Sequence, residues 1–412
     1  MTENKPTSLS LEGTDENSIC AYTDDYFINT ARIVAANGES IVTYAVFIRR
    51  PSVMAAKIAL DWMERVAEVQ NFPLHIIPNF EEGDSVGAGD PLLYITGPLS
   101  RLAPLETIFL QKLGPTCVAA MNARDAALAY SSVPFIAMDA RHDAGREMQE
   151  MMGYAAFVGS ESAKKKNPGT RGFIGTANEI TSKLYFGQET GMGTMPHAYI
   201  GYIKNLLHKA GDTATNALVR AAQLYREQFP QKKFIVLPDY DGHEVTDALA
   251  VCRAFPKEAS TGELMFRLDT HGGRYIEGLD KKGSYDVMER RAPDYMRGMR
   301  TPEELGIIYG EGVTVSAVWH FREKLDEAGF PNVKIVGSSG FNALKCRVMG
   351  HAGAPLDFIG TGSFLPENWK ETYSTADIIC YDGNFSVKVG REHLISAYQA
   401  KFGGVQPALP KK

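Results

Sequence analysis

Short apolar runs, each followed at once by polar or glycine-rich residues, recur along the chain after about residue 130. Five such runs occupy residues 133–138, 234–237, 264–268, 333–337 and 356–359. Their length and their content of Val, Ile, Leu and Phe are typical of buried strands. Helical patterns follow two of the runs, one to about residue 253 and one over residues 342–349. This alternation predicts an α/β domain over residues 131–370.

The residues that follow these runs are rich in polar side chains and glycine. They include Asp139, Arg141 and His142, Asp239 and Asp241, Asp269, Ser338 to Gly340, and Gly360 to Ser363. The carboxyl ends of parallel strands meet at one edge, where both β/α barrels and doubly wound sheets build their ligand sites. We therefore expect these residues at one rim, while the pattern alone leaves the closure of the sheet open.

The first part of the chain has a mixed pattern. Residues 26–32 suit a short helix, residues 41–48 and 92–96 suit strands, residues 83–90 suit a turn, and helical spacing returns after Pro98. This mixture predicts an α+β N-terminal domain over residues 19–130. The polar residues 1–18 are expected to be flexible.

Composition limits the classes of partner. The 412 residues suffice for two or three domains with a buried core. A net charge of -6 gives no general signature of nucleic-acid binding. No run approaches the roughly 18 apolar residues of a membrane span, and residues 1–17 lack the pattern of a signal peptide. We expect a cytoplasmic protein with no nucleic-acid or membrane partner.

Neither the cysteines nor the histidines indicate a fixed metal site. The five cysteines are widely spaced and form no C-x-x-C pair, so reduced structural thiols are expected. His142 beside Asp143 is too short a match to predict a metallophosphohydrolase. Magnesium carried in by a phosphorylated substrate is a separate expectation.

His197 lies at the start of a predicted helix. Pro196 suits the first helical position, apolar residues follow with helical spacing, and Gly211 ends the pattern. The unpaired N–H groups of a helix N-terminus attract anions, so they would stabilise a phosphate on or beside the imidazole. A nucleophilic histidine is the functional interpretation, and a histidine that caps or packs beside its helix is the ordinary one.

Two small-residue segments follow predicted strands and suit phosphate binding. Ser338-Ser339-Gly340 and Gly360-Thr361-Gly362-Ser363 offer backbone N–H groups that a phosphate can approach closely. A tight structural turn is the alternative for such a segment.

Charged residues after other strands suggest further contacts. Arg267 and Asp269 share one side of a strand end. The arginine could bind a carboxylate or phosphate, and the aspartate could contact ribose or solvated magnesium, although a plain ion pair is the alternative. Asp239 and Asp241 are weaker candidates of the same kind, or helix caps. The lysines at 164–166 are expected in a solvated loop, with a basic lid over pyrophosphate as the alternative.

Gly-Thr-Met-Pro-His-Ala at residues 193–198 resembles the phosphorylatable-histidine motif of nicotinate phosphoribosyltransferases. Further segments resemble the same family in the same order: Thr23-Asp-Asp-Tyr26, Gly175-Thr-Ala-Asn178, Arg267-Leu-Asp-Thr270, and Ser338-Ser-Gly340 with Asp357-Phe-Ile-Gly-Thr-Gly-Ser363. The resemblance runs from about residue 20 to about residue 390. It implies the type II phosphoribosyltransferase fold, an incomplete β/α barrel whose α+β N-terminal domain is rejoined by residues 371–412.

The resemblance also implies an activity and partners. Enzymes of this family join nicotinic acid to phosphoribosyl pyrophosphate, with magnesium, and form nicotinate mononucleotide and pyrophosphate in NAD biosynthesis. They couple this reaction to ATP hydrolysis through a phosphohistidine, which the resemblance implies would be His197 in this chain. Homodimers with shared active sites are implied as well.

Residue roles follow from the same resemblance. Arg267 would face the nicotinate carboxylate, Thr194 would line that pocket, and Tyr26 would stack on the pyridine ring from the neighbouring subunit. The 5-phosphate would be held by Ser363 and its glycines. Arg141 lies where the family shows an aromatic residue followed by two arginines, but the aromatic residue is missing here and His142 is the second basic residue.

Two alternatives remain from the sequence. The base could be nicotinamide or quinolinate, although quinolinate has two carboxylates and calls for more cations than Arg141 and Arg267. A barrel that binds phosphosugars without turnover is the other alternative, and such a protein has no need of a phosphate acceptor at His197.

Overall fold

The computed structural model describes residues 8, 11–365 and 373–409, which form two compact units. Of the described residues, those within 1–124, 143–166 and 365–409 belong to the first unit, and those within 125–142 and 167–364 belong to the second. Of the residues expected to be flexible, 1–7 and 9–10 lie outside the described part. Residues 16–18 are helical instead, because Asp15 caps the helix by accepting a hydrogen bond from the backbone N–H of Ser18.

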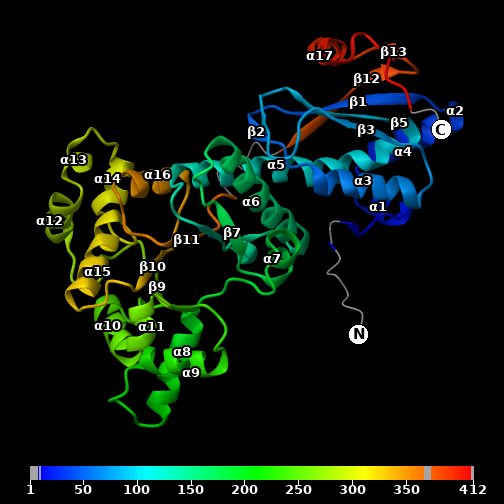
Figure 1. The fold of residues 1–412 in the computed structure, drawn as a ribbon. Helices are drawn as coiled ribbons and strands as arrows, with labels where there is room; N and C mark the ends of the chain where they lie inside the picture. The colour runs from blue at the N-terminus through cyan, green and yellow to red at the C-terminus, as the bar shows by residue number, and fades with distance from the viewer. Residues whose placement is uncertain (1–7, 9–10, 366–372, 410–412) are drawn as a thin grey trace. The chain divides into compact units, whose positions relative to one another are not determined.

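The first unit contains a five-stranded antiparallel sheet in the order β13-β12-β1-β5-β3 (Figure 1). Its strands are β1 (Ile41–Ile48), β3 (His75–Pro78), β5 (Pro91–Pro98), β12 (Ser374–Tyr381) and β13 (Asn384–Phe385), and β2 (Ser52–Val53) pairs separately with β4 (Ser85–Val86). Its helices are α1 (Glu16–Tyr22), α2 (Asp25–Asn37), α3 (Lys57–Val69), α4 (Leu99–Leu102), η2 (Ala103–Leu105), α5 (Glu106–Ala129), α6 (Arg146–Lys166) and α17 (Glu392–Phe402).

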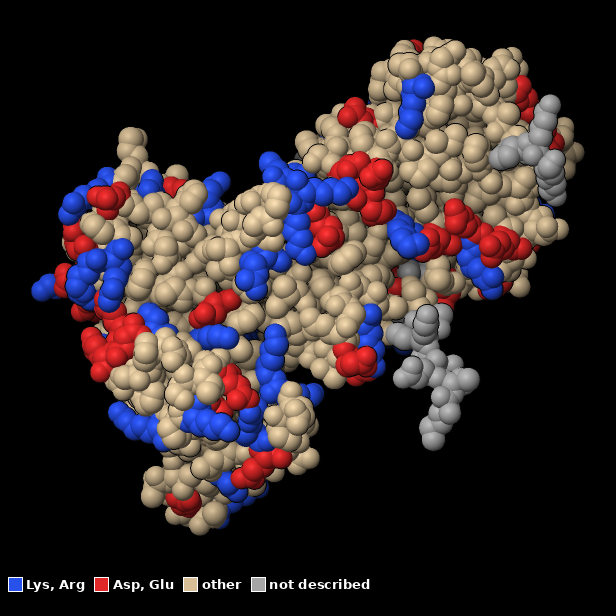
Figure 2. All heavy atoms as spheres, in the orientation of Figure 1, with Lys and Arg blue, Asp and Glu red and all other residues tan. Residues whose placement is uncertain are grey.

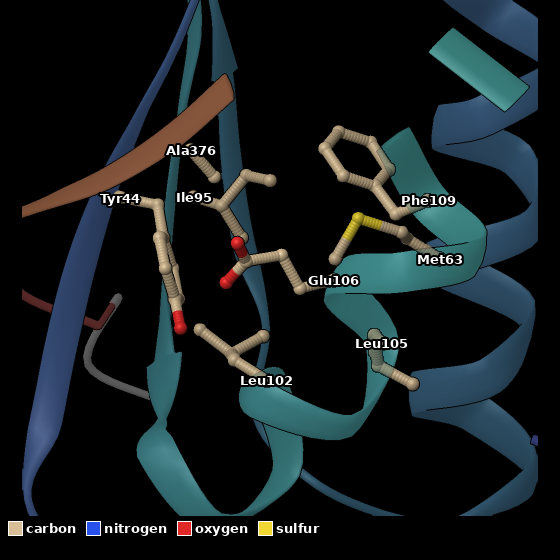
Figure 3. A pocket seen from close by; sticks show the side chains of 8 residues that line it. All are labelled: Tyr44, Met63, Ile95, Leu102, Leu105, Glu106, Phe109 and Ala376. Atoms are coloured by element: carbon tan, nitrogen blue, oxygen red, sulfur yellow. The ribbon is translucent and has the colours of Figure 1, made fainter. Parts of the chain in front are cut away.

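Alternation along β1 places apolar side chains on both faces of this sheet. Phe47 packs with Leu394 and Tyr398 of α17 on one face. Tyr44 faces a small apolar pocket with Met63 of α3 and Phe109 of α5 on the other (Figure 3). Because both faces are covered, the strand is buried along almost its whole length.

The second unit contains a six-stranded parallel sheet. Its strands are β6 (Phe135–Ala137), β7 (Phe173–Thr176), β8 (Phe234–Val236), β9 (Leu264–Leu268), β10 (Lys334–Gly337) and β11 (Phe358–Thr361). Its helices are η3 (Ala140–His142), α7 (Glu179–Phe186), α8 (His197–Lys209), α9 (Ala217–Gln228), α10 (Glu244–Ala254), α11 (Pro256–Thr261), α12 (Lys281–Arg291), α13 (Pro293–Arg297), α14 (Pro302–Tyr309), α15 (Val315–Glu327) and α16 (Ala343–His351).

The strand order, β7-β6-β11-β10-β9-β8, confirms the incomplete β/α barrel. The last strand, β11, pairs in parallel with the first, β6, as in a closed barrel. Among the described residues no ladder joins β7 to β8, so the barrel is open there. The connection across this opening is long and carries α7, α8 and α9.

Three local expectations need correction. The lysines at 164–166 form the last turn of α6 rather than a loop, because cations at a helix C-terminus complement its dipole and Lys165 binds Asp84 at 3.0 Å. Pro196 is the cap before α8, so His197 is the first helical residue. The last strand, expected at 356–359, is β11, whose bounds make Gly360 and Thr361 strand residues.

The distribution of charge and the character of the helices bear on the kinds of partner. On the face shown in Figure 2, acidic and basic side chains are interspersed, without an extended field of one sign. Within the described ranges, the helices are too short or too polar to cross a membrane.

Candidate functional site

His197 and Asp239 form a close pair beside the opening of the barrel. Both carboxylate oxygens of Asp239, which follows β8, lie 3.1 Å from Nε2 of His197. A carboxylate only accepts hydrogen bonds, so Nε2 is the nitrogen that donates to Asp239, and Nδ1 is not part of this pair. The Asp239 side chain is 6% exposed and that of His197 is 46% exposed. A buried carboxylate thus orients an accessible imidazole, an arrangement that suits a nucleophilic histidine.

A buried network holds the loop that carries Asp239. Arg274 donates one hydrogen bond to the backbone oxygen of Asp239, at 3.2 Å, and another to the carboxylate of Glu244. Glu244 is fully buried in the first turn of α10 and also accepts a hydrogen bond from Thr270. The loops after β8 and β9 are therefore tied together.

Asp241, two residues after Asp239, has a different partner. Its carboxylate pairs with Lys204 of α8, whose ammonium also lies 5.2 Å from the centre of the Tyr240 ring. The two aspartates therefore contact different side chains and do not form one carboxylate pair.

Arg267 and Asp269 lie together at the end of β9, as their spacing predicts. Nη1 of Arg267 donates to Asp269 at 3.2 Å, and Nη2 approaches the backbone oxygen of Met195 at 3.5 Å. This is the plain ion pair that the sequence left as an alternative. Burial lowers the pKa of Arg267, although the charges of Asp269 and Asp239 oppose this effect.

The arginine is only partly satisfied. Its Nε is buried and has no hydrogen-bond partner within the described residues. A buried guanidinium with a free donor is costly unless an anion or acceptor completes it. Thr194 lies in the segment that precedes α8. It is half-buried, and the nearby Met192 and Met195 are buried.

The segment Ser338 to Gly340 forms a left-handed turn after β10. Ser339 has a φ of +78° and Gly340 a φ of +69°. The Ser338 hydroxyl lies 3.0 Å from a carboxylate oxygen of Asp269 and 2.9 Å from the backbone oxygen of Leu268, so its single proton can serve either acceptor, and both contacts join this turn to the end of β9. In the described structure, the backbone N–H groups of Ser339 and Gly340 have no partner. Such a turn suits an anion.

The second small-residue segment has a structural explanation for its glycines. A Cβ on Gly360 would meet the side-chain sulfur of Met138, and one on Gly362 would lie 2.9 Å from the backbone Cα of Asp139. The close approach of the chain after β11 to the end of β6 therefore requires a small residue at position 362. Thr361 is buried and its hydroxyl is engaged, while Ser363 at the strand end is half-buried.

Two further candidates lie outside this cluster of contacts. Arg141 is exposed in η3 and donates to His142, and its charge contributes to lowering the pKa of Arg267. Tyr26 belongs to the first unit, where its side chain on α2 is 62% exposed. A tyrosine that is so exposed buries little of its ring within the first unit.

The carboxylates do not form a metal site by themselves. The described ranges contain no group of three or more His, Cys, Asp or Glu side chains that could hold a metal ion. All five cysteines are free.

Arg274 and Glu244 were not predicted from the sequence, and neither was Lys345 of α16, whose ammonium donates to the backbone oxygen of Ser339. Glu244 gave no signal, since an acidic residue in a first turn is ordinary. Lys345 did give one, because a cation in the first turn of a helix opposes the helix dipole.

Comparison with known proteins agrees with the fold described above. Nicotinate-nucleotide pyrophosphorylase from Pyrococcus furiosus has a TM-score of 0.63 at 21% identity, covering 91% of this chain and 79% of that one. Human nicotinic acid phosphoribosyltransferase has a TM-score of 0.57 at 15% identity, covering 90% and 76%. The enzyme from Ehrlichia chaffeensis, also a nicotinate-nucleotide pyrophosphorylase, has a TM-score of 0.52 at 13% identity, covering 88% and 96%.

These similarities establish the fold: the chain has the type II phosphoribosyltransferase fold. No family model and no curated protein sequence matches the chain.

Proposed function

We propose that this chain, on its type II phosphoribosyltransferase fold, joins nicotinic acid to C1 of phosphoribosyl pyrophosphate. The products are nicotinate mononucleotide and pyrophosphate. The observation that best supports the proposal is the set of contacts at the ends of β8, β9 and β10. There a histidine–carboxylate pair, a buried arginine with a free donor and a left-handed serine–glycine turn meet within one unit.

The chemistry requires alignment more than covalent participation by the protein. The pyridine nitrogen attacks C1 as the bond from C1 to the pyrophosphate oxygen breaks, and the bonding electrons leave with pyrophosphate. The sugar passes through a cationic state, so fixed groups that orient the base and stabilise the leaving group supply the catalysis. Arg267 would orient the base through its carboxylate, and Ser339 and Gly340 would hold the 5-phosphate.

His197 would couple the reaction to ATP. Nδ1 would attack the γ-phosphorus of ATP, ADP would leave, and water would later release phosphate from the imidazole. Asp239 would keep the proton on Nε2 and stabilise the positive ring that forms. The first residue of α8 is a favourable place for the added negative charge.

Magnesium would enter with the phosphorylated substrates. Asp239, Asp241 and Asp269 are each engaged by a cation or a histidine, so these residues do not fit a fixed site made by the protein alone. The ion would take most of its ligands from the substrate phosphates and water.

A base with one carboxylate fits the available cations best. Arg274 is engaged by Glu244 and Arg267 by Asp269, but Nε of Arg267 has no partner among the described residues, so Arg267, with Arg141 nearby, has a donor available for the base. Quinolinate would bring a second carboxylate that needs its own partner.

Product analysis tests this proposal. The protein is incubated with phosphoribosyl pyrophosphate, magnesium and either nicotinate, nicotinamide or quinolinate, with and without ATP. We expect the nicotinate reaction to be the fastest and to be stimulated by ATP. Turnover of another base alone would contradict the substrate, and no turnover of any base would contradict the activity.

A further inference from the structure

Lys345 links α16 to the left-handed turn after β10. Its ammonium donates to the backbone oxygen of Ser339 at 2.6 Å and lies 4.5 Å from the centre of the Phe341 ring. A lysine in the first turn of a helix is unfavourable for the helix itself, because the backbone N–H groups there already carry positive partial charge. Helix formation therefore does not account for this residue.

The turn needs support from outside. Ser339 adopts a left-handed conformation that is unfavourable for a non-glycine residue and persists only where surrounding contacts hold it. The bond from Lys345 fixes the Ser339 carbonyl, while Ser338 is fixed by Asp269. The N–H groups of Ser339 and Gly340 are left free of partners among the described residues.

Phe341 extends this support to the other small-residue segment. Its backbone oxygen accepts a hydrogen bond from Thr361 at 2.6 Å, and the same hydroxyl accepts one from the N–H of Ser363 at 3.0 Å. The ring has room because residue 337 is glycine, where a Cβ would lie 2.8 Å from Phe341. Lys345 and Phe341 together hold both segments in one arrangement.

The charge of Lys345 is not matched by an ion pair. Within the described structure no carboxylate lies within ion-pair distance of its ammonium, although the charge of Asp269 acts on it from farther away. Burial lowers the pKa of Lys345 to about 8. Lys345 is thus a half-buried cation without a paired anion, and it is hydrogen-bonded to a turn with free N–H groups. Such a cation raises the affinity of the turn for an anion.

We propose that Lys345 is a positioning residue for the 5-phosphate of phosphoribosyl pyrophosphate. It fixes the turn of Ser338 to Gly340 for that phosphate and stabilises the bound charge. This inference rests on the proposed function for the identity of the ligand.

Calorimetric binding of two probes to the full chain tests the role without requiring turnover. Ribose 5-phosphate presents the 5-phosphate alone, and magnesium pyrophosphate presents the leaving group alone. We expect Lys345→Met to weaken ribose 5-phosphate binding at least tenfold and to change pyrophosphate binding less than threefold. Lys345→Gln, which keeps a donor but not the charge, should fall between Lys345→Met and the wild type.

The controls separate this role from general destabilisation. Lys324→Met, on the surface of α15, should bind both probes like the wild type. If Lys345→Met does not fold, Lys345→Gln serves as the test variant. We expect it to bind ribose 5-phosphate at least threefold more weakly than the wild type. The inference would be overturned if the folded variants bound ribose 5-phosphate as tightly as the wild type does. It would also be overturned if both probes lost affinity equally, or if the wild type did not bind ribose 5-phosphate.

Kinetics then distinguish this inference from the proposed function. In an active enzyme, Lys345→Met should raise the KM for phosphoribosyl pyrophosphate at least tenfold and leave the KM for nicotinate nearly unchanged. The wild type could turn over no pyridine base and still bind ribose 5-phosphate more tightly than Lys345→Met does. In that case the proposed function fails and the role of Lys345 stands.

Discussion

At the scale of single residues, the candidate site consists of charges that hold one another in place. Asp239 orients His197, and Asp269 contacts both Arg267 and Ser338. The first contact joins the end of β8 to α8, the second lies within the end of β9, and the third joins the ends of β9 and β10. A change of one side chain should therefore alter a specific step rather than the whole fold.

Asp239→Asn should slow phosphorylation of His197 by about 100-fold or more. An amide can accept or donate, so it no longer fixes the proton on Nε2 or stabilises a charged ring. The measurement is transfer of label from [γ-³²P]ATP to the protein, as an acid-labile, base-stable phosphate. His197→Ala should abolish the label.

The matched control is Asp326→Asn, which removes a surface carboxylate of α15. It should be labelled like the wild type. Full labelling of Asp239→Asn would show that this carboxylate does not activate the histidine, and persistent labelling of His197→Ala would place the phosphate elsewhere.

Arg267→Lys should raise the KM for nicotinate and affect nicotinamide less. An ammonium cannot form the bidentate contact that a guanidinium offers to a carboxylate. Loss of such a charge-assisted contact costs roughly 1.5–3 kcal/mol, which is about 10- to 150-fold in affinity. Steady-state kinetics with both bases measure the difference, and an equal loss for both would remove Arg267 from the carboxylate role.

At the scale of elements, strands were easier to predict than connections. The apolar runs at 41–48 and 264–268 match β1 and β9 residue for residue, because burial on both faces leaves a continuous apolar pattern. Strand β7 was missed, since four residues that include glycine give little pattern. Helix α6 was missed because its lysines and the following Asn-Pro-Gly were interpreted as a loop.

The sequence pattern predicts which residues lie at the rim of the sheet, but it does not predict which of them contact one another. Polar residues after parallel strands must lie at one edge, whichever sheet they belong to. His197 and Asp239 are separated by 42 positions, and only the packing of α8 against residues 239–241, which follow β8, decides that they touch. The bond from Lys345 to Ser339 likewise depends on the left-handed turn between them.

The start of α5 places a carboxylate in an apolar pocket of the first unit, and this predicts a pH dependence of stability. Glu106 extends from α5 towards Tyr44 and Ile95 (Figure 3). Burial and the charges of Asp377 and Asp24 raise its pKa to about 7, against a weaker opposite effect of the Tyr44 hydroxyl.

Glu106→Gln should therefore stabilise the protein at pH 8 and much less at pH 5. Between its ordinary pKa of 4.5 and about 7, the folded state keeps a proton that the unfolded state has lost, so the wild type loses stability as pH rises. Because solvent screens this half-buried group, we expect Glu106→Gln to raise the free energy of unfolding by about 1–2 kcal/mol at pH 8.

Denaturant unfolding at the two pH values measures this difference. The control Glu64→Gln removes an exposed carboxylate of α3 and should show no such pH dependence. A gain for Glu106→Gln that is the same at both pH values would contradict a raised pKa at Glu106.

At the scale of the whole molecule, the exposed Tyr26 bears on assembly. If Tyr26 of one subunit completes the site of another, Tyr26→Ala and His197→Ala subunits are defective at different sites. Mixing them after mild dissociation should form heterodimers with one intact site each, and part of the activity should return. Heterodimers that form but stay inactive would restrict Tyr26 to its own subunit.

The central claim is that the rim of the second unit binds phosphoribosyl pyrophosphate. A crystal structure of the protein with this compound and magnesium measures that directly. We expect the 5-phosphate against the N–H groups of Ser339 and Gly340 and beside Ser363, with C1 facing the side of Arg267. A 5-phosphate bound away from both small-residue segments would contradict the account.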